Sequence, residues 1–232
     1  MITTAALLLA LCVTEAEGPA QAAAPPPRVA QPDPPPSSPP SFEHLPGPVL
    51  LAAGLGLGVP FGSAPGDVPM SQLVKAQLRI PLQVGFRITP SVMAGAYVDI
   101  GFGAAGPATL EACHAAGGSG CGATSVHVGV QGRYAFTPTA SRTPWVSAGA
   151  GWESTGVTFS GSSAGNLSYS GTELRLGAGY DLRNDGRIGY GLFVDGALGW
   201  YQHAWGVGGS STLPGQPAHG WVQAGVRMLL LP

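Results

Sequence analysis

One stretch of this sequence alternates strictly between two kinds of residue. From 74 to 88, every even position is apolar, whereas the odd positions hold Lys75, Arg79, Arg87, two glutamines, one glycine and one proline. Because successive side chains of a strand point to opposite faces, the stretch predicts a strand with one fully apolar face and one polar face. At about 3.3 Å per residue, such a strand would be about 50 Å long, which exceeds a typical strand of a soluble protein. The length suits a tilted strand that crosses a membrane and projects beyond it.

The same alternation recurs along the chain and predicts eight strands in all. They are expected at 49–59, 74–88, 92–102, 126–136, 145–153, 173–182, 188–200 and 222–230. Within each strand the charged residues fall on one parity, and the other parity carries no charge. This favours a membrane barrel over a soluble β-sandwich or a soluble lipocalin-like barrel, which would also alternate but would carry more charge on their outer faces.

The connections between these strands alternate in length. Three are short, at 89–91, 137–144 and 183–187, and four are longer, at about 60–73, 103–125, 154–172 and 201–221. Bacterial outer-membrane barrels have an even number of strands, short periplasmic turns and longer extracellular loops. We therefore expect an all-β fold, an eight-stranded antiparallel up-and-down transmembrane β-barrel at 48–232, with both of its ends on the periplasmic side.

Composition agrees with this fold class and excludes others. Only 9% of the residues are charged, whereas soluble proteins average about 25%. The net charge of −2 and the single lysine argue against a nucleic-acid partner, which requires a basic face. The 44% hydrophobic content argues against a wholly disordered chain.

The N-terminal region predicts export. Residues 5–13 form an apolar segment that is too short to span a bilayer but suits a signal peptide, and Ala20-Gln21-Ala22 offers small residues for cleavage, so we expect a signal peptide at 1–22. No lysine or arginine precedes the apolar segment, which leaves a buried N-terminal helix as the alternative. Residues 23–47 are expected to be a disordered Pro-rich linker, since 11 of the 24 residues from Pro25 to Pro48 are proline. The linker is either a tether that contacts peptidoglycan or a periplasmic protein, or a leader without a partner.

In strand number, alternation and loop asymmetry, residues 48–232 resemble the small eight-stranded outer-membrane β-barrel family, which includes the OmpA-like, OmpX-like and OmpW-like barrel domains. The resemblance implies a monomer in the bacterial outer membrane, with membrane lipid and the outer-membrane assembly machinery as partners. In that family the last strand usually ends in an aromatic residue that the assembly machinery recognises. This chain ends instead with the residues Met-Leu-Leu-Leu-Pro at 228–232.

The polar parity of the strands is expected to face the barrel interior, where an uncompensated charge is costly. Six positive and five negative charges nearly cancel there, so we expect an ion-pair network that plugs the lumen. Its members are Lys75, Arg79, Arg87, Arg133, Arg175, Arg227, Asp99, Glu153, Glu173, Asp181 and Asp195. The turns place Asp99 diagonal to Arg79 and Arg175 directly opposite Asp195, with Glu153 and Glu173 near Arg175. The alternative is a narrow channel for small or apolar solutes, for which the strand glycines leave space.

The longest connection carries Cys113 and Cys121, which are expected to form a disulfide, with two free thiols as the alternative. Ser125 and His127 share one strand face, as a lipid-modifying enzyme would require, although a packed histidine is the simpler interpretation. The five histidines are scattered and suggest no metal site, and no cofactor motif is present. The sequence therefore favours a non-enzymatic barrel with a structural or surface-interaction role.

Overall fold

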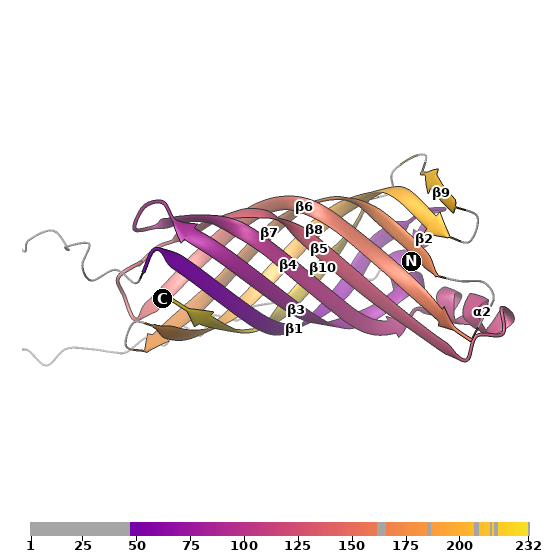
Figure 1. The fold of residues 1–232 in the computed structure, drawn as a ribbon, viewed down its shortest axis with the longest axis horizontal. Coiled ribbons are helices and arrows are strands. Elements are labelled where there is room, and N and C mark those ends of the chain that lie inside the picture. Colours follow the sequence, from indigo (N-terminus) through magenta and orange to yellow (C-terminus); the bar gives the residue numbers. More distant parts are fainter. Residues whose placement is uncertain are drawn as a thin grey trace, which may run out of the picture. The chain divides into compact units, whose positions relative to one another are not determined.

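The computed structural model describes residues 47–161, 166–184, 187–206, 209–213, 215 and 218–231. The expected signal peptide at 1–22 and nearly all of the expected Pro-rich linker at 23–47 lie outside these residues. The described part consists mainly of long β-strands (Figure 1).

Eight of these strands form a closed antiparallel barrel (Figure 1). In chain order they are β1 (Val49–Ala64), β3 (Val74–Arg87), β4 (Val92–Ala105), β5 (Gly120–Ala135), β6 (Arg142–Ser160), β7 (Leu167–Asn184), β8 (Ile188–Gly206) and β10 (Ala218–Leu230). Each pairs with the next along the chain, and β10 closes the sheet on β1, with Leu230 opposite Leu51. The expected eight-stranded up-and-down barrel is confirmed.

The observed strands cover nearly all of the expected ranges, and most of them extend further toward the long connections. β5 begins at Gly120 instead of 126, and β6 continues to Ser160 instead of 153. These extensions are rich in glycine, serine and threonine, so they lack the apolar contrast that marks a strand in the sequence. They are strands because backbone hydrogen bonds between neighbours continue there, with Gly120 opposite Ser160.

The outer face of the barrel strands is apolar. Large side chains such as Leu57, Val130 and Leu176 expose about two thirds of their surface, at 65%, 66% and 68%. Among the described residues, the only exposed charged side chains on the strands are Lys75 and Arg142, and each lies at a strand end. A soluble protein rarely leaves so much contiguous apolar surface in water, whereas a lipid environment favours it.

The two ends of the barrel differ. One end holds the short turns, the beginning of β1 and the end of β10 (Figure 1). The opposite end holds the long connections, whose described residues form two short strands and two helices: β2 (Val68–Pro69), α1 (Met70–Leu73), α2 (Pro107–Ala115) and β9 (Gly209–Thr212). Neither helix is long and apolar enough to cross a membrane.

An apolar cluster lies near each end of the barrel interior. Toward the long connections, buried residues of α1 and the strand ends pack together: Ala64, Met70, Val74, Ala105, Ala123, Val157, Tyr201 and Trp221. Toward the short turns the cluster consists of Leu50, Ala52, Met93, Leu229 and Leu231. The polar groups of the lumen lie between these clusters.

The expected disulfide is confirmed. Cys113, in α2, is joined to Cys121, in β5, with 6.2 Å between their Cα atoms. The bond ties α2 to the strand that follows it.

Candidate functional site in the barrel lumen

A central cluster of charges lies midway along the lumen and consists of Arg79, Asp99, Arg175, Asp195 and Gln223. Arg79 Nε lies 3.2 Å from Asp99 Oδ1. Arg175 Nη2 lies 3.0 Å from Asp99 Oδ2 and 2.8 Å from Asp195 Oδ2. The Gln223 amide donates to both aspartates, at 2.9 and 3.1 Å. Two positive and two negative charges are balanced here, and the two arginines also lie over the rings of Trp221 and Tyr97.

A turn-end cluster lies closer to the short turns and consists of Arg133, Trp145, Asp181 and Arg227. The Asp181 carboxylate accepts hydrogen bonds from both arginines and, at 3.1 Å, from the Trp145 indole N–H. Both guanidinium groups also lie over the Trp145 ring, at 4.5 and 3.9 Å from its centroid. One negative charge therefore faces two positive charges, and the indole provides the additional contact.

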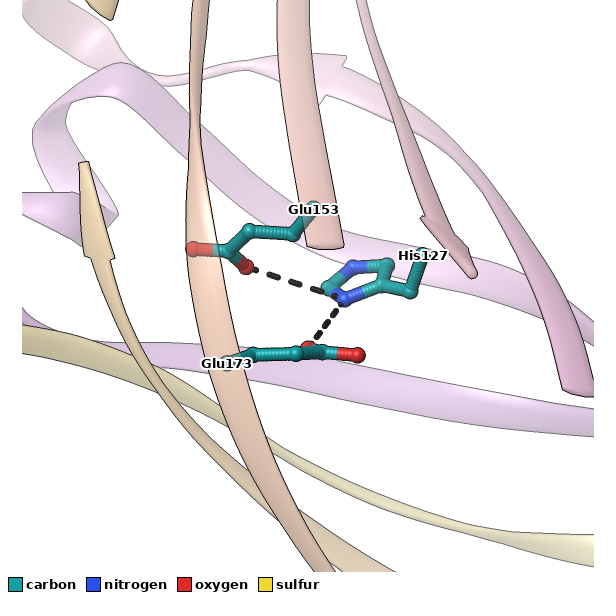
Figure 2. A group of neighbouring side chains, drawn as sticks. All are labelled: His127, Glu153 and Glu173. Carbon is teal, nitrogen blue, oxygen red and sulfur yellow. Dashed lines mark hydrogen bonds and ion pairs between the residues drawn. The ribbon is translucent and has the colours of Figure 1, made fainter. Parts of the chain in front are cut away.

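A loop-end cluster lies closer to the long connections and consists of Tyr97, His127, Glu153, Glu173 and His219. His127 lies between the two carboxylates, with its Nδ1 atom 2.6 Å from Glu173 Oε2 and 3.6 Å from Glu153 Oε2 (Figure 2). His219 Nε2 contacts the other oxygen of Glu153, and the Tyr97 hydroxyl donates to Glu173 at 2.8 Å. Within the described part of the chain, neither carboxylate forms an ion pair with an arginine or lysine.

Glycine residues, which have no side chain, make room for the loop-end cluster. A Cβ atom at Gly199 would collide with the Glu153 carboxylate and lie 2.9 Å from His219 Nε2. A Cβ atom at Gly129 or Gly151 would lie 2.6 or 2.5 Å from the Tyr97 hydroxyl. The inward glycines of β5, β6 and β8 thus allow long polar side chains from other strands to meet in the lumen.

Nine of the eleven expected lumen residues belong to the three clusters, and two do not. Lys75 is exposed, because the register between β3 and β4 shifts between Val74 and Gln77 and Val74 takes the buried position. Arg87 is half-buried at the end of β3 and donates to the Pro90 carbonyl at 2.9 Å. Both were expected on the inward face, and neither contacts the clusters.

The expected pairings are partly correct. Asp99 lies opposite Pro81 and pairs diagonally with Arg79, as expected. Arg175 is not directly opposite Asp195, since it faces Ala197. The hairpin pairs Asn184 with Ile188 and is centred one residue later than expected, so Arg175 reaches Asp195 on the diagonal instead.

The expected network contained only charged side chains and so did not include the uncharged members of the inward face. The inward parity also carries Gln77, Tyr97, Trp145, His219, Trp221 and Gln223, and all of them are buried. The signal that could have found them is the same parity, applied to aromatic and amide residues as well.

The neighbouring Ser125 and His127 do not form a nucleophile and base. Both are buried in the lumen, at 1% exposure. The Ser125 hydroxyl donates to Gln77 Oε1 at 2.6 Å, whereas the His127 Nδ1 atom faces Glu173. The geometry that a lipid-hydrolysing pair requires is not present in these side chains.

Similar folds occur among solved structures. Neisserial surface protein A matches this chain with a TM-score of 0.52 and 12% identity, over 79% of this chain and 97% of that one. The chain has the fold of a small outer-membrane β-barrel. At this identity the likeness concerns the fold alone.

Two further matches have lower scores. Ail, the attachment invasion locus protein of Yersinia pestis, gives a TM-score of 0.46 and 11% identity over 78% of this chain and 97% of that one. The N-terminal β-barrel domain of Pseudomonas aeruginosa OprF gives 0.42 and 14%, over 80% and 99%. No protein-family model matches the sequence, and no curated protein matches it either.

Proposed function

We propose that this chain is an outer-membrane β-barrel protein of a Gram-negative bacterium, with a structural or surface-interaction role and no catalytic reaction of its own. The observation that carries the proposal is the separation of residue types across the barrel wall. Apolar side chains cover the outer face, and the charged clusters lie within. Membrane lipid contacts the outer face, and the outer-membrane assembly machinery inserts the barrel as a monomer.

The lumen is closed by its own side chains in this proposal. The central and turn-end clusters cross the interior, and the apolar clusters lie on either side of them. A cavity bordered by Arg79, Asp99 and Arg175 has a volume of about 10 Å³, which is room for about one water molecule. This supports a plug that fixes strand register and disfavours a channel for small or apolar solutes.

The short turns face the periplasm and the long connections face the outside. The asymmetry of connection lengths supports this orientation. The Cys113–Cys121 disulfide fits an oxidising compartment, which both the periplasm and the cell exterior provide. The Pro-rich linker, which precedes β1, then lies in the periplasm and is available to peptidoglycan or a periplasmic protein. The surface offered to partners outside the cell is formed by α1, α2, β2 and β9.

Heat-modifiable gel migration of the outer-membrane fraction tests the proposal. A folded barrel migrates differently before and after boiling, and we expect this shift in the membrane fraction and not in the soluble fraction. A soluble protein with a single migration position would contradict the membrane role. Recordings in planar bilayers test the closed lumen separately, since a steady single-channel conductance of the folded protein would favour the channel.

A further inference from the structure

The loop-end cluster has the composition of a metal site. It brings two imidazoles and two carboxylates together from four strands: His127 of β5, Glu153 of β6, Glu173 of β7 and His219 of β10. The ligand atoms of the first three lie within 4.8 Å of one another (Figure 2). Imidazole nitrogen and carboxylate oxygen are the donors that divalent transition metals accept, whereas Mg²⁺ and Ca²⁺ favour oxygen alone.

The charges of the cluster also favour a cation. Glu153 and Glu173 are 1% and 2% exposed, and among the described residues their ion-pair partners are only His127 and His219. The two arginines of the central cluster pair with its two aspartates and form no ion pair with Glu153 or Glu173. Two buried carboxylates are costly without compensation, and one divalent ion would neutralise them.

The geometry requires only a small adjustment. In a tetrahedral zinc site with bonds of about 2.0–2.2 Å, neighbouring ligand atoms are about 3.4 Å apart. The 3.6 Å between His127 Nδ1 and Glu153 Oε2 already agrees with that spacing. The 2.6 Å between His127 Nδ1 and Glu173 Oε2 is a hydrogen-bond distance, so the pair would separate by about 0.8 Å as the ion takes the place of the proton.

The surroundings hold the ligands in orientation. The Tyr97 hydroxyl occupies Glu173 Oε1, which leaves Oε2 facing His127. The His219 ring is stacked on Tyr201, with centroids 3.7 Å apart and planes inclined by 13°. Contacts of this kind around the ligands are a regular part of protein metal sites.

We propose that His127, Glu153 and Glu173 bind one divalent transition-metal ion of the Zn²⁺ class in the barrel lumen, and that His219 orients Glu153 by contacting its other carboxylate oxygen. The ion links β5, β6 and β7 on the inner face of the barrel, and the contact between His219 and Glu153 connects β10 to the same site. Because the ligands are buried between the apolar cluster near the long connections and the central cluster, the ion is taken up while the barrel folds. The role is structural and is independent of what the outer loops contact.

The test uses the untagged full-length chain, refolded from urea into detergent micelles with Co²⁺ as the only added metal. After unbound ion is removed, we expect a one-to-one ratio of Co²⁺ to protein by mass spectrometry, together with the visible absorption of four-coordinate Co²⁺. The double variant with His127→Gln and Glu153→Gln should lose both signals. A matched double variant with His114→Gln and His203→Gln, whose histidines lie outside the cluster, should keep both.

Two results would overturn the proposal: wild-type protein that folds in Co²⁺ but retains none, or equal retention by both double variants. If the lumen variant does not fold, the wild type alone decides. We then expect protein folded with Co²⁺ to unfold on gels at a higher temperature than protein folded with a chelator present. Equal unfolding temperatures would also overturn it.

Discussion

The single carboxylate of Asp181 forms ion pairs with two buried guanidinium groups, those of Arg133 and Arg227. The Asp181 side chain is fully buried, so water does not take over the role of its carboxylate when that charge is lost. Trp145 donates one hydrogen bond to Asp181, and both arginines lie over the face of its ring. The loss of this one carboxylate would leave Arg133 and Arg227 without an ion-pair partner among the described residues.

We expect Asp181→Asn to lower the free energy of unfolding by about 3–5 kcal/mol, because it leaves two buried positive charges without a counter-ion. Urea unfolding of the barrel in lipid vesicles measures the change. Asp67→Asn is the matched control, since Asp67 is exposed in a turn, and its effect should stay within about 0.5 kcal/mol. A similar stability of both variants would argue against the ion-pair plug.

Tyr97 provides a second test at the scale of one atom. Tyr97→Phe keeps the ring over Arg175 and removes only the hydroxyl that donates to the Glu173 carboxylate. A hydrogen bond to a charged acceptor contributes about 1.5–3 kcal/mol, so we expect a loss of that size in the same unfolding measurement. Tyr134→Phe, on the exposed outer face, should have little effect.

At the scale of elements, the sequence reveals the strands well and their irregularities poorly. Strict alternation identified all eight barrel strands, because one face meets lipid and the other meets the lumen. Alternation cannot reveal a shift such as the one between Val74 and Gln77, where backbone pairing changes and Lys75 becomes exposed. For the same reason, the hairpin between β7 and β8 differs from its expected centre, and Arg175 reaches Asp195 on the diagonal.

In the lumen, too, the alternation of the sequence predicts which side chains point inward but not which of them contact each other. Parity placed Glu153 and Glu173 inside, but it could not show that their partners are His127 and His219. His219 lies on the last strand, which pairs with β8, and it meets Glu153 of β6 because the curvature of the sheet brings their inward side chains together. Such a contact depends on the number of strands and on the register of each one, so short-range sequence patterns do not contain it.

The disulfide allows a test of the α2 segment. Because α2 packs little of its surface on the barrel and is tied by Cys113–Cys121, we expect reduction to expose the bond after Glu111 to a glutamate-specific protease. Mass spectrometry should find cleavage there in reduced protein and not in oxidised protein. Glu153 and Glu173, which are buried in the lumen, should resist in both samples, and cleavage after either would indicate that the barrel had opened.

At the scale of the whole molecule, the orientation across the membrane can be measured with single cysteines. With Cys12, Cys113 and Cys121 all replaced by serine, Ala112→Cys marks the long-connection end and Thr139→Cys marks a short turn, and both positions are exposed. In intact cells, a membrane-impermeant maleimide should label Ala112→Cys and leave Thr139→Cys unlabelled until the outer membrane is opened. The opposite pattern would reverse the proposed orientation.

The barrel wall is not equally tall around its circumference. β6, β7 and β8 have 19, 18 and 19 residues, whereas β3 and β4 have 14 each and β10 has 13. Five additional residues add about 16 Å of strand at about 3.3 Å each. In a membrane, the side formed by β6, β7 and β8 would project further beyond the lipid headgroups as paired strands, whereas α1 and α2 lie on the side of the shorter β3 and β4. A large molecule arriving from outside would then meet extended strands on one flank and short helices on the other, so that any encounter with the outer surface has a preferred direction.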